Sequence, residues 1–246
     1  INETLKQTAT FPNAYALKTL ILRRLGRTDE VQATLEQGLA HDALDPMLRY
    51  VAGNLETVDP KTLLAVACDL EKFGELELAQ ALALESANRP LTNFGNPAPM
   101  AHYLRAEWFD QVGRAEDAAA ARAAAHGVST LYAFPFGLDE YDALQAALAA
   151  DDSDVLALSL LGSWLMNAKR TADAAEVLVK SAKLGSTDPV TWRNAAVAVV
   201  NSAVGTDQDQ VKVAEQAHNL YLKAIELAPA DARLIFEIDQ LAGRRG

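Results

Sequence analysis

The residues that could do chemistry in this 246-residue chain are scattered along it. Its histidines are His41, His102, His126 and His218. None of them has a second histidine at the i+4 spacing of a helical metal site, or a cysteine partner. Ser129, Ser159 and Ser163 lack the Gly-x-Ser-x-Gly context of a hydrolase nucleophile. The sequence therefore predicts no catalytic residue, no metal site and no cofactor.

One acidic run, at residues 151–154, resembles the start of a calcium-binding loop. The glycine and the later bidentate glutamate of such a loop are missing. Asp and Ser side chains accept hydrogen bonds from the free N–H groups at a helix start. We therefore expect this run to end one helix and to cap the next.

Composition narrows the class of protein. Half of the residues are hydrophobic, only 7% are aromatic, and alanine runs such as residues 118–121 favour helix. The net charge of −11 argues against nucleic acid, which needs a concentrated basic surface. No apolar run reaches the roughly 18 residues of a membrane span. We predict an all-α protein that binds neither nucleic acid nor membrane, with a cytoplasmic location.

Two further features bear on the chain's context. Cys68 is the single cysteine, so it has no intrachain disulfide partner, and its apolar neighbours predict a buried side chain. The chain opens at Ile1 without a methionine, in a segment that already reads as mid-protein. We interpret it as a fragment of a larger polypeptide.

The elements that must position any site form a repeat. Residues 158–165, with Leu158, Leu161, Gly162 and Leu165, recur as residues 192–199, an offset of 34 residues. This period in a helical pattern is typical of stacked helix–turn–helix units. Gly26, Gly74 and Gly113 each follow an apolar helix and precede another, which predicts three earlier hairpins. Extra residues near Gly205 lengthen the last helix–helix connection.

The later units resemble the tetratricopeptide repeat (TPR). The resemblance rests on Ala217-x-x-x-Tyr221 and on the closing run from Ala224 to Pro229. It implies a right-handed α-solenoid of helix hairpins, about 12–14 helices with irregular insertions. Divergent hairpins fill residues 1–130. Residues 131–246 hold an extended aromatic segment, a half repeat, two clearer units and a C-terminal helix, all in one continuous solenoid.

Two irregular segments interrupt the hairpins. Residues 132–137 are aromatic and broken by a proline, so we expect an extended segment that fills the place of a missing helix with Phe134 and Phe136. The loop at residues 89–99 is expected to be anchored by Phe94.

A narrower resemblance covers roughly the last 115 residues. The run from Phe134 to Glu140, residues 191–194 and residues 231–241 resemble the repeat region of large bacterial proteins that carry an uncharacterised mutarotase-like β-sandwich domain. Gly137 stands where that family often has arginine. The resemblance implies an association with carbohydrate handling and supplies no catalytic residue here.

The concave groove of such a solenoid is the expected binding surface. The first helix of each hairpin lines this groove. Residues of these helices that do not belong to the face packed on neighbouring helices are expected to point into the groove. The candidates are Tyr103, Glu107, Ser159, Ser163, Arg193 and Asn194. Arg193 could clamp a ligand carboxylate or make a structural ion pair with a neighbouring unit, and the sequence leaves both open.

Some TPR domains hold the C-terminal carboxylate of chaperones through groove lysine and asparagine residues. The corresponding positions hold Ala16, Leu20, Leu64, Cys68, Tyr103, Glu107, Ser159 and Ser163. A chaperone-tail clamp is therefore not expected.

Three hypotheses for function follow. The first is a non-catalytic interaction module whose groove binds a protein, a peptide or another domain of the parent chain. The alternative is an accessory domain that completes the active site of a carbohydrate-active enzyme. The third is a self-associating scaffold.

Overall fold

A computed structural model describes residues 1–8, 10–207 and 209–243, with side chains up to residue 240. These residues form fourteen α-helices and no strand beyond one isolated bridge between Thr92 and Gly95. The all-α prediction is confirmed. The chain divides into two compact units, residues 1–101 and 102–246, and the division falls inside α7 (Ala98–Gln111). The sequence-based division at residue 130 stays a prediction.

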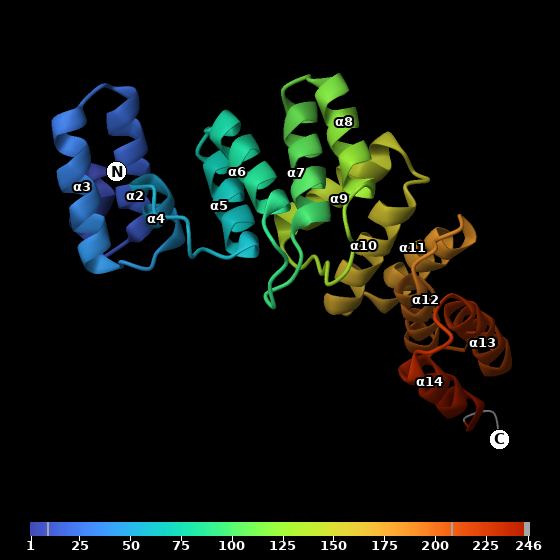
Figure 1. Ribbon diagram of the computed structural model, residues 1–246. Coiled ribbons are helices and arrows are strands. Elements are labelled where there is room, and N and C mark those ends of the chain that lie inside the picture. The colour runs from blue at the N-terminus through green and yellow to red at the C-terminus, as the bar shows by residue number, and fades with distance from the viewer. Residues whose placement is uncertain (9, 208, 244–246) are drawn as a thin grey trace. The chain divides into compact units, whose positions relative to one another are not determined.

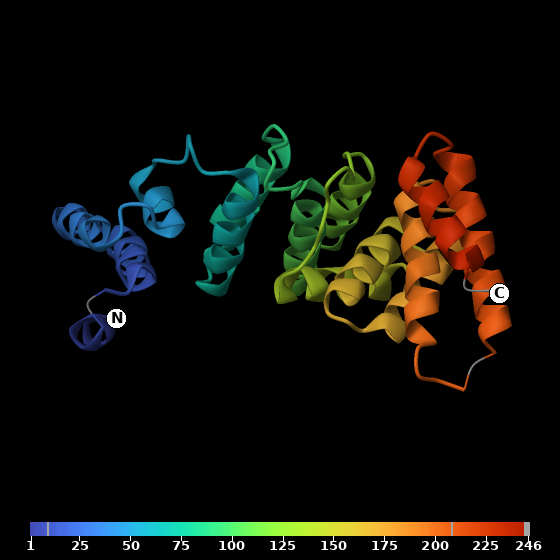
Figure 2. The ribbon, with the colours of Figure 1, turned by 90° about the horizontal axis from the view of Figure 1, so that it is seen from below.

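The first unit is built from helix hairpins. Its helices are α1 (Asn2–Gln7), α2 (Pro12–Arg24), α3 (Thr28–His41), α4 (Pro46–Ala52), α5 (Pro60–Lys72) and α6 (Leu76–Asn88). Helices α2 and α3 lie side by side, as do α5 and α6 (Figures 1 and 2). Short α4 packs on α2 without a second helix of its own. Cys68 is buried on α5, as predicted.

The second unit continues the same construction. After α7 come α8 (Ala115–His126), α9 (Leu138–Ala150), α10 (Val155–Asn167), α11 (Thr171–Lys183), α12 (Pro189–Ser202), α13 (Gln210–Leu227) and α14 (Ala232–Gly243). Helices α10 to α13 pack in chain order, each on the next, and α14 packs on α13 (Figure 1). The predicted stack of hairpins is therefore confirmed within the unit.

Aspartate caps begin the helices of the hairpins. The Asp59 carboxylate accepts hydrogen bonds from the Lys61 and Thr62 amides, and Asp154 accepts one from Ala157. Asp45, Asp188 and Asp209 cap α4, α12 and α13 in the same way. Such caps satisfy N–H groups that have no partner within the helix. The predicted capping role of Asp154 is confirmed.

Close helix approach in the second unit depends on Gly162. A Cβ atom built on Gly162 would lie 2.3 Å from Cγ of the fully buried Leu178 on α11. Only a residue without a side chain fits here, so Gly162 sets how closely α10 and α11 pack.

Three sequence predictions about irregular regions need correction. Phe94 is exposed, so it does not anchor its loop. Phe134 and Phe136 are also exposed, at 60% and 61%, so they do not fill the place of a missing helix. The added residues before α13 lengthen the helix as well as the turn, because α13 has 18 residues and α11 has 13.

The phenylalanines of the aromatic segment face outward, opposite to the prediction, for a simple geometric reason. Side chains of an extended chain alternate between two sides, and the pattern of residue types does not say which side faces inward. Here Ala133 and the neighbouring Pro135 are buried, and the two phenylalanines face outward.

Candidate functional site

A cleft of about 340 Å³ lies in the second unit, between the aromatic segment and the helices α10 and α12. Its volume is within the usual range of ligand pockets. Its wall on one side comes from residues 129–134, and on the other from α10 and the start of α12. Three of the six candidate groove residues line it: Ser159, Ser163 and Asn194.

The aromatic wall is held in place by α9 and α10. The indole Nε1 of Trp164 donates to the carbonyl of Gly137 at 2.8 Å, and its ring packs on Tyr141. The Glu140 carboxylate accepts hydrogen bonds from the amides of Phe136 and Gly137 at 2.7 and 2.8 Å. These bonds tie the segment to α9 and α10 through its backbone.

Tyr132 and Phe134 supply exposed aromatic side chains to a cleft whose lining also includes Leu131, Leu156 and Leu160. Tyr132 and Phe134 are 56% and 60% exposed, although both are large and apolar. Tyr132 also has a φ of +60°. This left-handed conformation is costly for a residue with a bulky side chain, and such strain gathers at ligand-binding positions.

The opposite wall combines apolar side chains with neutral hydroxyl and amide groups. Ser159 Oγ donates to the Val155 carbonyl and lies 2.9 Å from both Ser181 Oγ and Thr191 Oγ1. This hydroxyl cluster joins α10, α11 and α12. Ser163 Oγ donates to the Ser159 carbonyl at 3.0 Å, so only its acceptor lone pairs are left for a ligand.

Asn194 contributes the complementary donor. Its Oδ1 accepts a hydrogen bond from Arg193 Nη1 at 2.9 Å. Among the described residues its Nδ2 group has no hydrogen-bond partner, and the residue lines the cleft. The cleft therefore presents a neutral acceptor on α10 and a neutral donor on α12.

Among the described residues, Asp188 is the one carboxylate that lines the cleft. One of its oxygens accepts from the Val190 amide at 2.9 Å, and the other accepts from Thr191 Oγ1 at 3.3 Å. Both oxygens are thus engaged in capping α12. In the part of the chain that the structure describes, no lysine or arginine lines this cleft.

Tyr103, a predicted groove residue, lies elsewhere. Its side chain is fully buried, and its hydroxyl donates to the Asp154 carboxylate, with distances of 3.0 and 2.9 Å to the two oxygens. Burial and the Asp154 charge raise the pKa of Tyr103 well above its usual value. The expectation that Tyr103 points into a groove is therefore wrong. Glu107, one turn further along α7, accepts a hydrogen bond from Gln111 and does not line the cleft.

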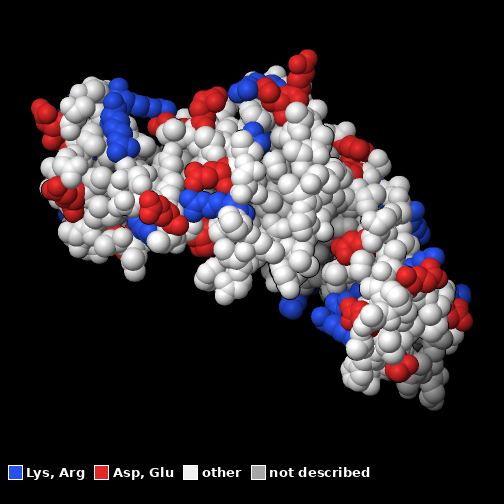
Figure 3. Space-filling model, in the orientation of Figure 1, with Lys and Arg blue, Asp and Glu red and all other residues white. Residues whose placement is uncertain are grey.

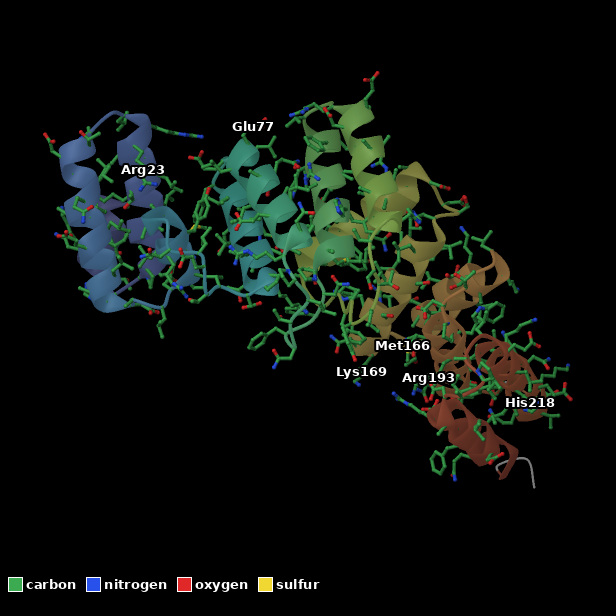
Figure 4. The ribbon with its side chains drawn as sticks, in the orientation of Figure 1. Arg23, Glu77, Met166, Lys169, Arg193 and His218 are labelled. Atoms are coloured by element: carbon green, nitrogen blue, oxygen red, sulfur yellow. The ribbon has the colours of Figure 1, made fainter. Side chains whose placement is uncertain are left out.

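Arg193 makes an ion pair inside the chain. Its Nε and Nη2 atoms donate to the two carboxylate oxygens of Glu237 on α14, at 2.8 and 2.7 Å. Arg193 itself lies on α12 and is labelled in Figure 4. Each of the two side chains is only 19% exposed. Of the two roles left open by the sequence, the structure shows the ion pair. Tyr132 belongs to the aromatic segment that was predicted from the sequence, but neither Tyr132 nor Thr191 was predicted to line a binding site, because neither belongs to the repeated pattern.

A second hollow of about 580 Å³ lies along α11, α12 and α13, and charged as well as apolar side chains line it. In the face shown in Figure 3, basic and acidic side chains are interspersed. Within the described residues, no helix has the length and apolar character needed to span a bilayer. No group of three His, Cys, Asp or Glu residues is placed to hold a metal ion in that part of the chain.

The comparisons with known proteins give a likeness to solved repeat structures. No family model matches the chain, and no curated protein matches it. YrrB, a TPR protein described with an unusual peptide-binding site, is 15% identical with a TM-score of 0.37, covering 97% of each chain. MamA from Desulfovibrio magneticus RS-1 is 16% identical with a TM-score of 0.33, covering 90% of this chain and 97% of that one.

A third solved structure, pilF of Pseudomonas aeruginosa, is 16% identical with a TM-score of 0.35, covering 95% of this chain and 87% of that one. At such identities and TM-scores the likeness assigns no residue of this chain. This chain is similar to helical-repeat proteins, and its site is defined by its own geometry.

Proposed function

We propose that this chain is a non-catalytic interaction module whose cleft binds an extended, uncharged peptide segment of a partner protein or of another domain of the parent chain. The observation that carries the proposal is the pairing of exposed Tyr132 and Phe134 with the neutral donor and acceptor of Asn194 and Ser163.

The polar groups fit a peptide backbone. An extended peptide offers alternating N–H and C=O groups, which need an acceptor and a donor respectively. Ser163 Oγ supplies the acceptor and Asn194 Nδ2 supplies the donor. The aromatic wall would cover apolar side chains of the same segment, as in other grooves that bind extended peptides.

Charge favours a neutral segment. None of the described residues that line the cleft is a lysine or arginine that could pair with an acidic side chain, and both Asp188 oxygens already accept hydrogen bonds. Glycoside hydrolysis uses two carboxyl groups, whereas Asp188 is the one carboxylate among the described residues of the cleft. The lining therefore argues against acid–base catalysis within the cleft. The accessory role in a carbohydrate-active enzyme stays the alternative.

A selection experiment tests the proposal. A random 12-residue peptide library is displayed on phage and selected on the full chain, and enriched peptides are measured by fluorescence polarisation. We expect uncharged peptides with aromatic or aliphatic side chains. Binding should fall about tenfold in Asn194→Ala, the value of roughly one hydrogen bond, and also in Phe134→Ala.

The matched control is Asn201→Ala, since Asn201 is exposed on the same helix and does not line the cleft. Enrichment of no peptide, or equal binding by Asn194→Ala and Asn201→Ala, would count against the proposal. Binding to a glycan array in place of peptides would favour the alternative.

A further inference from the structure

The amide group of Asn194 is oriented by its neighbour Arg193. A guanidinium can only donate hydrogen bonds, so the atom facing Arg193 Nη1 at 2.9 Å is the amide oxygen. The Nδ2 group is then left for the cleft. Without this bond the amide could turn over and present either its donor or its acceptor, because the two ends have nearly the same shape.

Arg193 is itself fixed by the C-terminal helix. Two of its nitrogens bind the two oxygens of Glu237 on α14, 44 residues away in sequence. Such a planar, bidentate pair restrains the guanidinium more than a single contact does. The third nitrogen is thereby aimed at Asn194.

Glu237 is held in turn from two further sides. Arg233 Nε donates to Oε1 at 2.8 Å, and the Tyr221 hydroxyl of α13 donates to Oε2 at 3.1 Å. Leu234, on the same helix, is almost fully buried. The carboxylate is therefore part of the docked position of α14, and its bonds to Arg193 exist only while α14 is docked.

We propose that α14 is a positioning element for the cleft, because Glu237 acts through Arg193 to hold Asn194 so that it donates to a peptide carbonyl. Glu237 and Arg193 are positioning residues that need not touch the ligand. This inference rests on the proposed function for its ligand, but the orientation of Asn194 can be measured without one.

The test combines a ligand-free signal with binding. The side-chain amide cross-peaks of Asn194 in an ¹⁵N–¹H NMR spectrum are assigned by their loss in Asn194→Asp. Glu237→Gln keeps the shape of the side chain, but its amide nitrogen cannot accept a hydrogen bond. We expect these cross-peaks to shift or broaden in Glu237→Gln, and also in Arg193→Lys, which keeps the charge but loses the planar fork. Affinity for a library-selected peptide should fall about three- to tenfold.

The matched control is Glu226→Gln on α13, whose exposed carboxylate pairs with Lys223. It should leave the Asn194 cross-peaks and the affinity unchanged. Unchanged cross-peaks in Glu237→Gln would overturn the positioning role, whatever the peptides do. Shifted cross-peaks without binding of any peptide would support the positioning role while contradicting the proposed function.

Discussion

Strain in single residues has a clear pattern in the hairpin turns. Gly26, Gly74 and Gly113 all have φ near +70° where one helix turns into the next. The equivalent turn between α10 and α11 uses Lys169, with φ of +63°. Glycine adopts this conformation without a steric cost, whereas a side chain makes it unfavourable by about 1 kcal/mol.

Lys169→Gly should therefore stabilise the chain by up to about 1 kcal/mol, since the strain of the left-handed backbone is removed. Urea denaturation monitored by circular dichroism measures the change. Lys169→Ala provides the control, because alanine keeps the strain and should leave the stability nearly unchanged. A destabilised Lys169→Gly variant would contradict the assignment of strain.

A second prediction at this scale concerns the buried pair of Tyr103 and Asp154. Tyr103→Phe removes the hydroxyl that donates to the carboxylate. The free energy of unfolding should fall by about 1.5–3 kcal/mol, the usual value for a hydrogen bond to a charged group. Tyr132→Phe removes a hydroxyl from a half-exposed side chain and should change stability by less than about 0.5 kcal/mol. Equal effects in chemical denaturation would contradict this.

The surroundings of some single residues were predictable from the sequence, and those of others were not. The capping role of Asp154 and the burial of Cys68 were predictable, because both follow from local chemistry and helical spacing. The burial of Tyr103 was not predictable, because its hydrogen-bond partner Asp154 lies 51 residues away in sequence and no local pattern indicates the contact.

At the level of elements, the contact between α10 and α11 is sensitive to substitution at Gly162, which lies against Leu178. Gly162→Ala would place a methyl group against Leu178, at a distance that no packed side chain accepts. We expect a loss of about 1–3 kcal/mol, the usual cost of overpacking a core. Gly127→Ala is the matched control, because the nearest atom to its new Cβ is 3.5 Å away and its φ is −88°. Thermal unfolding of both variants measures the difference.

The docking of α14 should depend on pH. Burial alone would raise the pKa of Glu237, but its hydrogen bonds with Arg193 and Arg233 lower the pKa below the usual value of about 4.3. A lowered pKa gives stability that is present above the unfolded-state pKa and is lost as pH falls through the native-state pKa. Wild type should be more stable than Glu237→Gln at pH 7, with the gap closing below about pH 4.

Melting temperatures across this pH range check the expectation, with Glu226→Gln as the reference variant. A gap between wild type and Glu237→Gln that persists unchanged at pH 3 would show that the carboxylate charge does not hold α14.

Helices and their boundaries were the most predictable elements. Aspartate followed by proline marked the starts of α4, α5 and α12, and glycine marked the turns of three hairpins. The aromatic segment was located correctly, but the residues that face inward were not. Alternating side chains in an extended segment do not by themselves show which set is buried. The cleft could be predicted only in part, since its aromatic wall lies outside the repeat.

At the level of the whole molecule, the two units have separate sets of internal contacts. In a stack of repeats, each repeat is stabilised mainly by its contacts with its nearest neighbours. Gly162→Ala should therefore speed hydrogen exchange in α10, α11 and α12, and leave α2, α3 and α5 close to wild type. Exchange measured by mass spectrometry resolves these helices. Uniform acceleration along the chain would show one cooperative unit instead.

The alternation of buried and exposed side chains in residues 133–136 also limits which insertions and deletions this segment can accept. Ala133 and Pro135 face inward, and Phe134 and Phe136 face outward. Deleting or inserting one residue just before this stretch would exchange the two sets, turning the phenylalanines toward the helices and emptying the aromatic wall. Homologues that keep the wall should therefore gain or lose residues here in pairs.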